Sequence, residues 1–360
     1  MKRNSKRRKM SNRKMSRKVS SRRKMYRKAK FNTSSSSLKH NLSMFEKLPS
    51  ETVGDIASFL RPPERLNLAL VNKRTLTDVG LDPNKPKPYT WIGQTLKPDI
   101  NISPEELHML FRMAPTIKGL DLTNCANIED LNGIQKLKNL ETLILTNTAI
   151  SRIEPLRKLK NLTYLSLKGM FDLVDIDPLR NLKKLKYIDM SETNVYDIEP
   201  LMYLTNLRYL NLMFNDNIEN IQLEFLSGLI NLNSIELSNR SIEDIEPLIH
   251  LTNLESLVIA HQNLETIEPL RHLKNLKHLS IPFTNTEDIE PLRHLKKLKT
   301  LDISYTHISN LEPLRGLKHL KYINIYDSNV FDLDPLRGKI KYRNIKVNPE
   351  NFPAIAFAGF

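Results

Sequence analysis

The 360-residue sequence has few of the residues that build disulfide frameworks, metal sites or phosphate-binding loops. Its single cysteine, Cys125, excludes an internal disulfide, and the cysteine and histidine spacings that bind structural zinc are absent. Only ten glycines are present, and no glycine-rich phosphate-binding motif occurs. We therefore predict that the chain is not an enzyme and has neither metal nor other cofactor. The cysteine usage favours an intracellular protein, in the nucleus or the cytoplasm.

Long apolar runs are missing as well. No stretch approaches the ~20 residues that a helix needs to span a bilayer, and the basic N-terminus is not followed by the apolar region of a secretory signal. The sequence thus predicts neither membrane insertion nor secretion.

Acidic residues are absent from residues 1–30, which hold 16 of the 55 lysines and arginines. The other 39 basic residues nearly balance the 40 acidic ones, so the net charge of +15 comes from this segment. We interpret residues 1–43 as a disordered basic tail and serine-rich linker. Nuclear import, contact with nucleic acid and association with an anionic membrane surface are its three candidate roles.

Residues 44–80 predict a small helical domain. One apolar helical stripe ends at the Pro62–Pro63 pair, and a second begins at Leu66. The order of residues in this segment resembles an F-box. It begins with LP, an acidic residue and Ile, continues with FL before two prolines, and ends with Leu, Leu, Val and a basic NKR. Thr75 and Leu76 stand where that family usually has a tryptophan.

Residues 81–116 form a connector that contains four of the prolines in its first part and Trp91. At its end, Ser103, Pro104 and Glu106 have the spacing of a capping box with proline at the first helical position. We expect a short helix there that shields the first repeat.

From residue 117 to about 345 the sequence repeats the motif LxxLxL with a period of 22 residues, lengthened to 23 twice and to 25 once. The alternation of each LxL pair predicts a strand, with Leu143 and Leu145 inward and Thr142 and Ile144 outward. The following IEPLR phrase predicts an outer turn, and the 25-residue unit should bulge there, at residues 219–228. Ten strands are expected, centred on Leu120, Leu143, Leu165, Ile188, Leu210, Ile235, Leu257, Leu279, Leu301 and Ile323.

These units resemble the short leucine-rich repeats of the internalin and Sds-like type. The resemblance implies an α/β fold, a leucine-rich-repeat horseshoe with a concave parallel β-sheet, preceded here by an all-α F-box-like domain and the tail, and followed by a C-terminal tail at residues 346–360. Where the family usually has asparagine, this chain mostly has a hydroxyl residue, while Asn215 keeps the amide. These hydroxyl residues are Thr148, Thr193, Thr284, Thr306 and Ser328.

The variable strand positions of such a horseshoe are its natural binding surface. Aromatic residues recur there, and they are typical of protein-binding hot spots, although tyrosine also simply suits a strand. The candidate target-binding residues are Tyr164, Tyr187, Tyr209, Phe214, Phe283, Tyr305, Tyr322 and Tyr326. His250, His272 and His294 share a phase in three outer turns, but outer positions diverge, which favours solvated side chains over a metal site.

An F-box followed by leucine-rich repeats resembles the substrate receptors of cullin ubiquitin ligases. The resemblance implies a Skp-type adaptor and a protein target, without a small-molecule substrate, and a monomer within a larger complex. The residues matched to the adaptor contact are Leu48, Pro49, Ile56, Phe59, Leu60, Leu66 and Val71. The alternatives are a repeat scaffold without a ligase link and a nuclear or nucleic-acid-associated factor, which rests on residues 1–30 alone.

Overall fold

The computed structural model describes residues 90–92, 95–113, 116–238, 242–260, 263–338, 340–341 and 344–347. The chain divides into two compact units, Met1–Asp99 with Arg112–Ala114, and Ile100–Phe111 with Pro115–Phe360. The predicted tail and F-box-like domain lie outside the described residues, as do residues 348–360. The same holds for every residue matched to the adaptor contact: Leu48, Pro49, Ile56, Phe59, Leu60, Leu66 and Val71.

In the first unit, β1 (Thr90–Ile92) and β2 (Thr95–Lys97) form an antiparallel hairpin in which Trp91 lies opposite Leu96. The connector thus contains two strands that its proline-rich sequence does not predict. Leu96 of β2 is fully buried.

The helix α6 (Pro104–Met113) begins at the predicted capping box. The Ser103 backbone N–H donates to Glu106 Oε2 at 3.0 Å, and the Glu106 N–H donates to Ser103 Oγ at 3.2 Å, which satisfies two helix-end donors. Leu107 and Phe111 are buried, and the Phe111 ring lies over Gly133 of the first repeat, where a Cβ would be 3.4 Å from it. The helix therefore covers the first repeat, as predicted.

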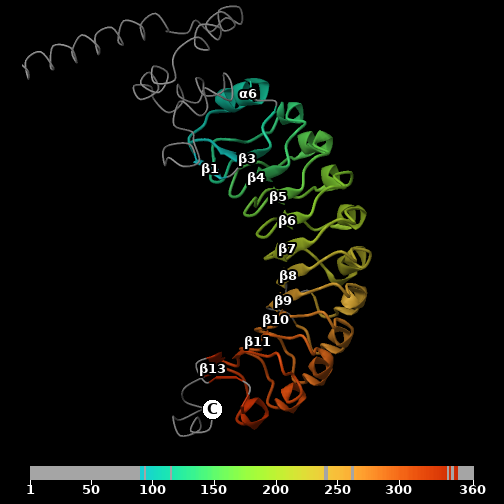
Figure 1. Ribbon diagram of the computed structural model, residues 1–360. Helices are drawn as coiled ribbons and strands as arrows, with labels where there is room; N and C mark the ends of the chain where they lie inside the picture. The colour runs from blue at the N-terminus through green and yellow to red at the C-terminus, as the bar shows by residue number, and fades with distance from the viewer. Residues whose placement is uncertain are drawn as a thin grey trace, which may run out of the picture. The chain divides into compact units, whose positions relative to one another are not determined.

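Strands β3 to β13 pair in parallel with their neighbours in chain order, and equivalent residues of successive repeats lie side by side. In the second unit they line the inner side of an arc and the turns line its outer side (Figure 1). The predicted strands are confirmed, and β13 adds one. Their bounds are β3 Gly119–Asp121, β4 Thr142–Ile144, β5 Tyr164–Ser166, β6 Tyr187–Asp189, β7 Tyr209–Met213, β8 Ser234–Ser238, β9 Ser256–Ala260, β10 His278–Ser280, β11 Thr300–Asp302, β12 Tyr322–Asn324 and β13 Ile345–Lys346.

Each return to the next strand passes through a 3-10 helix, in most repeats with proline in its first turn. Most span three to five residues, whereas η5 of the 25-residue repeat spans seven, which confirms the predicted outer bulge. Their bounds are η1 Ile134–Lys136, η2 Glu154–Lys158, η3 Asp177–Leu179, η4 Glu199–Tyr203, η5 Asn220–Leu226, η6 Glu246–His250, η7 Glu268–His272, η8 Glu290–His294, η9 Glu312–Leu314 and η10 Asp334–Leu336.

The core is a continuous stack of leucine and isoleucine side chains, one layer per repeat. Leu143 and Leu145 are fully buried, whereas Thr142 and Ile144, which alternate with them along the strand, are half-buried on the opposite face. Each repeat buries its leucine side chains only against the adjacent repeats. Contacts between adjacent repeats therefore stabilise the second unit.

The hydroxyl residues bond within their own repeat. Thr148 Oγ1 donates to the Leu145 carbonyl at 2.9 Å, and Thr193, Thr284, Thr306 and Ser328 donate to the residue three positions earlier in the same way. The Asn215 amide instead reaches the preceding repeat, donating to the Met190 carbonyl at 2.8 Å and accepting from Thr193 Oγ1. The substitution of hydroxyl for amide thus keeps the local turn and loses one link between repeats.

Candidate protein-binding surface

Three tyrosines form a stack on the strand face, which we name the tyrosine stack: Tyr164, Tyr187 and Tyr209. They open β5, β6 and β7 and are paired in register, so their rings follow the spacing of the strands. Ring centroids lie 4.1 Å apart between Tyr164 and Tyr187 and 4.2 Å apart between Tyr187 and Tyr209, with interplanar angles of 6° and 2°. All three are half-buried, so each keeps part of its side chain open to solvent.

A carboxylate ends the stack. The Tyr209 hydroxyl donates to Glu236 Oε1 at 2.9 Å. Burial, followed by this hydrogen bond, raises the pKa of Tyr209 to about 12, and burial also raises the pKa of Tyr187. Tyr187 and Tyr209 are therefore neutral at physiological pH, and the stack offers apolar ring surface together with hydroxyl groups.

Strands β6 and β11 end in an aspartate, Asp189 and Asp302 respectively, and both carboxylates accept hydrogen bonds from the chain that follows the strand. Asp189 Oδ1 accepts from the Ser191 N–H at 3.0 Å and from Ser191 Oγ at 2.7 Å, and Asp302 binds Ser304 in the same manner. These carboxylates hold the ends of β6 and β11, so they are occupied within the fold.

Wherever the structure describes it, the fourth residue after the strand centre takes a left-handed backbone conformation. Glycine, asparagine and aspartate tolerate this conformation, whereas in other residues it raises the free energy of the folded state by roughly 1–2 kcal/mol. Large aromatic residues nevertheless occupy it in three repeats: Phe214, Phe283 and Tyr305, with φ of 59°, 55° and 55°. The other residues at this position are Asn124, Asn147, Gly169, Glu192 and Asp327.

Two of these strained aromatic residues, Phe283 and Tyr305, form a second group together with Tyr326, which we name the strand-end cluster. The rings of Phe283 and Tyr305 stack at 4.2 Å and 8°, and the Tyr326 ring is tilted by 58° against Tyr305 at 5.6 Å. Lys346 Nζ lies 5.5 Å from the centre of the Tyr326 ring. Phe283 and Tyr305 stay about two fifths exposed, so the strained backbone holds apolar rings in solvent. Strained positions of this kind gather at functional sites.

The eight predicted target-binding residues thus fall into two groups and two single positions. Tyr164, Tyr187 and Tyr209 share one stack, and Phe283, Tyr305 and Tyr326 share the strand-end cluster. Phe214 lies at the left-handed position of its repeat, and Tyr322 opens β12, separated from the tyrosine stack by the four strands β8 to β11. The sequence contained a signal for the left-handed position, because the first three repeats have Asn, Asn and Gly there.

The outer face is a surface of paired charges. Arg157 bridges Glu154 and Asp177, and Arg180 bridges Asp177 and Glu199. These arginines hold the pKa of Asp177 and Glu199 below the usual range. From η7 onward each arginine pairs with the acidic residue of its own turn. Exposed pairs of this type contribute little to stability.

The predicted histidine row lies at the ends of η6, η7 and η8, as His250, His272 and His294. Over the residues that the structure describes, no three His, Cys, Asp or Glu side chains are placed to share a metal ion. In the same part of the chain, every helix is too short or too polar to cross a membrane.

Family models agree with this architecture. The model described as a leucine-rich repeat region matches residues 114–310, and a model of two leucine-rich repeat copies matches residues 296–338. The chain belongs to the leucine-rich repeat proteins. Leucine-rich repeats are a scaffold for protein–protein interaction, which presents an extended concave surface. Neither match reaches residues 44–80, and no curated protein matches the chain.

Solved structures of bacterial leucine-rich repeat proteins are similar. An internalin of Listeria monocytogenes, InlF, is 28% identical with a TM-score of 0.59 over 67% of this chain and 70% of that one. The functional domain of InlJ from the same species is 20% identical, with a TM-score of 0.52 over 66% of this chain and 55% of that one. A leucine-rich repeat protein of Leptospira interrogans is 19% identical, with a TM-score of 0.50 over 68% and 74%. The InlJ domain includes a cysteine ladder, whereas this chain has one cysteine.

Proposed function

We propose that the repeats bind a protein partner through the strand face, with the tyrosine stack as the anchor. The observation that carries the proposal is the parallel stacking of Tyr164, Tyr187 and Tyr209, half-exposed on a rigid sheet. Rings already fixed by their neighbours lose little conformational freedom on binding, which is the property of a hot spot. The proposed role is binding without catalysis, as is typical of leucine-rich repeats.

The strand-end cluster supports the same proposal. Its rings lie at the ends of the strands, and two of them occupy backbone conformations that asparagine or glycine would fill at lower free energy. These residues lower the stability of the fold and leave aromatic surface exposed. Binding of a partner to that surface explains why they occupy these positions.

The experiment replaces all three tyrosines of the stack by serine, the residue that Ser234 and Ser256 supply at the same strand position. Affinity purification of the wild type and this variant, followed by mass spectrometry, should show partners that only the wild type retains. Binding must then be reproduced with purified proteins. The matched control is Ile230→Ser, which removes an exposed apolar side chain that follows η5. The proposal fails if the triple variant retains every partner.

A narrower proposal is the substrate receptor of a cullin ubiquitin ligase. It depends on the F-box-like order of residues in 44–80, which lie outside the described residues and outside both family matches. The scaffold function does not require it.

We further propose a location in the nucleus or cytoplasm, supported by the single cysteine, Cys125, which is buried as a thiol. Removal of residues 1–30 from a tagged chain tests whether their 16 basic residues direct nuclear import. An unchanged distribution would remove the import hypothesis.

A further inference from the structure

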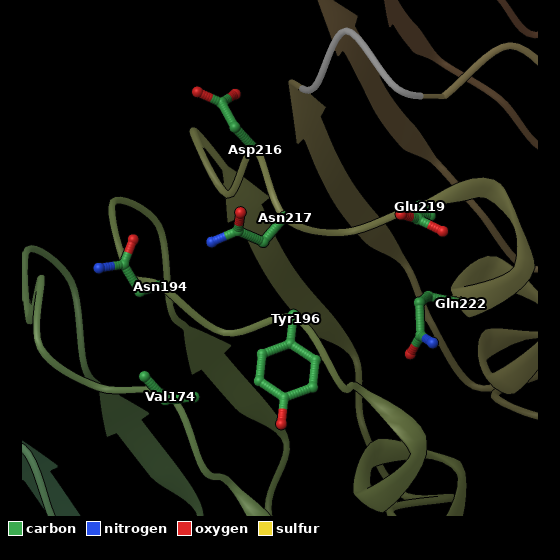
Figure 2. Close-up of a pocket in the computed structure, with 7 residues that line it drawn as sticks. All are labelled: Val174, Asn194, Tyr196, Asp216, Asn217, Glu219 and Gln222. Atoms are coloured by element: carbon green, nitrogen blue, oxygen red, sulfur yellow. The ribbon is translucent and has the colours of Figure 1, made fainter.

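The seven-residue turn η5 borders a groove. Residues 214–219 connect β7 to η5, and a groove of about 660 Å³ lies beside this connection and η5 (Figure 2). The groove lies within the second unit, on the flank between the strand ends and the outer turns, away from the tyrosine stack.

One wall of the groove is apolar. Tyr196 and Val174 come from the two preceding repeats, and both side chains line the groove in Figure 2. Their exposed fractions are 57% and 41%. Contiguous exposed apolar side chains on adjacent repeats mark an interaction surface more often than a solvated one.

The other wall is acidic and amide-rich. Asp216 and Glu219 line it, both exposed, together with Asn217 and Gln222. The Gln222 amide accepts from the Ile198 N–H at 3.1 Å and so ties η5 to the preceding repeat. Asn194 donates to the Phe171 carbonyl at 2.5 Å, which fixes the apolar wall in the same way. The groove is therefore held open by hydrogen bonds between repeats.

The groove differs in charge from a second hollow, which lies in the first repeats. That hollow, beside η2, combines the carboxylates of Asp130 and Glu154 with three basic side chains, Arg152, Arg157 and Lys158, so basic groups outnumber acidic ones there. Among the residues that the structure describes, no basic side chain lines the groove at η5, while two carboxylates do. The carboxylates beside an exposed tyrosine ring are complementary to a cation.

We propose that this groove binds a basic segment of a protein partner in which an arginine is followed by an apolar residue. An arginine of this segment stacks on the Tyr196 ring, further basic residues of the segment pair with the carboxylates of Asp216 and Glu219, and the apolar residue contacts Val174. Arginine suits the site because its planar cation binds both an aromatic face and a carboxylate. This site is independent of the tyrosine stack.

The test is fluorescence anisotropy with the purified full chain and a labelled peptide of alternating arginine and leucine. A second peptide with glutamine in place of arginine controls for the apolar contribution. The double variant Asp216→Asn with Glu219→Gln should weaken binding of the arginine peptide roughly tenfold, as expected for the loss of charge-assisted hydrogen bonds. Tyr196→Ala should also weaken it several-fold, whereas Tyr196→Phe keeps the ring and should keep the affinity.

The matched control is Glu265→Gln with Glu287→Gln, which removes the same charge from exposed flank positions of later repeats. It should change the affinity less than about twofold, since long-range attraction is screened at physiological salt. Equal weakening by both double variants would show a general charge effect and overturn the proposal, as would equal binding of the two peptides. Serine substitution of the tyrosine stack should leave this binding unchanged, so failure here and failure of the proposed function are distinguishable.

Discussion

The rings of Tyr187 and Tyr209 lie within 2° of parallel at 4.2 Å, and the Tyr209 hydroxyl is bonded to Glu236. The register of two parallel strands therefore places a neutral, partly desolvated phenol pair against a carboxylate. This arrangement gives the folded protein a measurable response to alkaline pH.

We expect the free energy of unfolding to fall as the pH rises from 10 to 12. The ordinary pKa of tyrosine is 10.0, and the folded state raises the pKa of Tyr209 to about 12. Between these values the unfolded chain has released the proton and the folded chain has not, so rising pH favours unfolding. Because solvent screens the half-buried ring, the loss is on the order of 1 kcal/mol.

Urea unfolding at a series of pH values measures this loss. Tyr209→Phe should reduce it, and Glu236→Gln should give an intermediate result because burial, the larger cause, remains. Identical pH dependence in the wild type and Tyr209→Phe would contradict the assignment.

Replacement of Phe214 by asparagine should stabilise the protein. Phe214 takes a φ of 59° and is about half exposed, so asparagine removes backbone strain and little buried surface. The expected gain in the free energy of unfolding is about 1 kcal/mol. Phe331→Asn is the control, because Phe331 is exposed without a left-handed backbone, and it should bring no gain. Chemical denaturation measures the free energy of unfolding of both variants. A Phe214→Asn variant that is less stable than the wild type would contradict the claim that the backbone at Phe214 is strained.

Gly169→Ala should destabilise the protein by roughly 1–2 kcal/mol. Gly169 has a φ of 69°, and an added Cβ would meet the Asn147 amide, which then has to give up its bond to Asn124. Gly228→Ala serves as the comparison, because its φ is not positive and no atom lies within 4 Å of the added carbon. Thermal unfolding should show a lowered midpoint for the first variant alone, and equal midpoints would rule out the left-handed requirement.

Adaptor binding tests the F-box hypothesis. If residues 44–80 act as an F-box, the full chain should co-purify with a Skp-type adaptor, and Leu48→Ala with Pro49→Ala should lose it because both residues match the motif's adaptor contact. The serine variant of the tyrosine stack should retain the adaptor. A wild-type chain that retrieves no adaptor would leave the scaffold function alone.

Most of the repeat architecture could be predicted from the sequence because one short pattern determines it. The burial of Leu143 and Leu145, the helix at Ser103 and the long turn η5 all follow from apolar spacing, capping and unit length. Strand β13 was missed because only Ile345 continues the period there, without the rest of the motif. The β1–β2 hairpin lies among prolines, with no alternation long enough to indicate strands.

The binding surface could be predicted only in part. Identical spacing was enough to place Tyr164, Tyr187 and Tyr209 in one column. The strain of Phe283 and Tyr305 was not predicted, because apolar periodicity carries no information on the sign of φ and the signal in Asn124, Asn147 and Gly169 was missed. The groove at Tyr196 is lined by side chains of three successive repeats, and the lengths of these repeats do not specify how the side chains meet.

The long turn η5 leaves the register of the sheet undisturbed. Tyr209 of β7 pairs with Ser234 of β8 in the same parallel alignment as every neighbouring pair, although 25 residues separate them instead of 22. Insertions on the outer side are thus absorbed without cost to the leucine stack. New recognition sites can therefore arise there by lengthening a loop, while the strand face changes by exchanging single side chains, and the two kinds of evolution need not interfere.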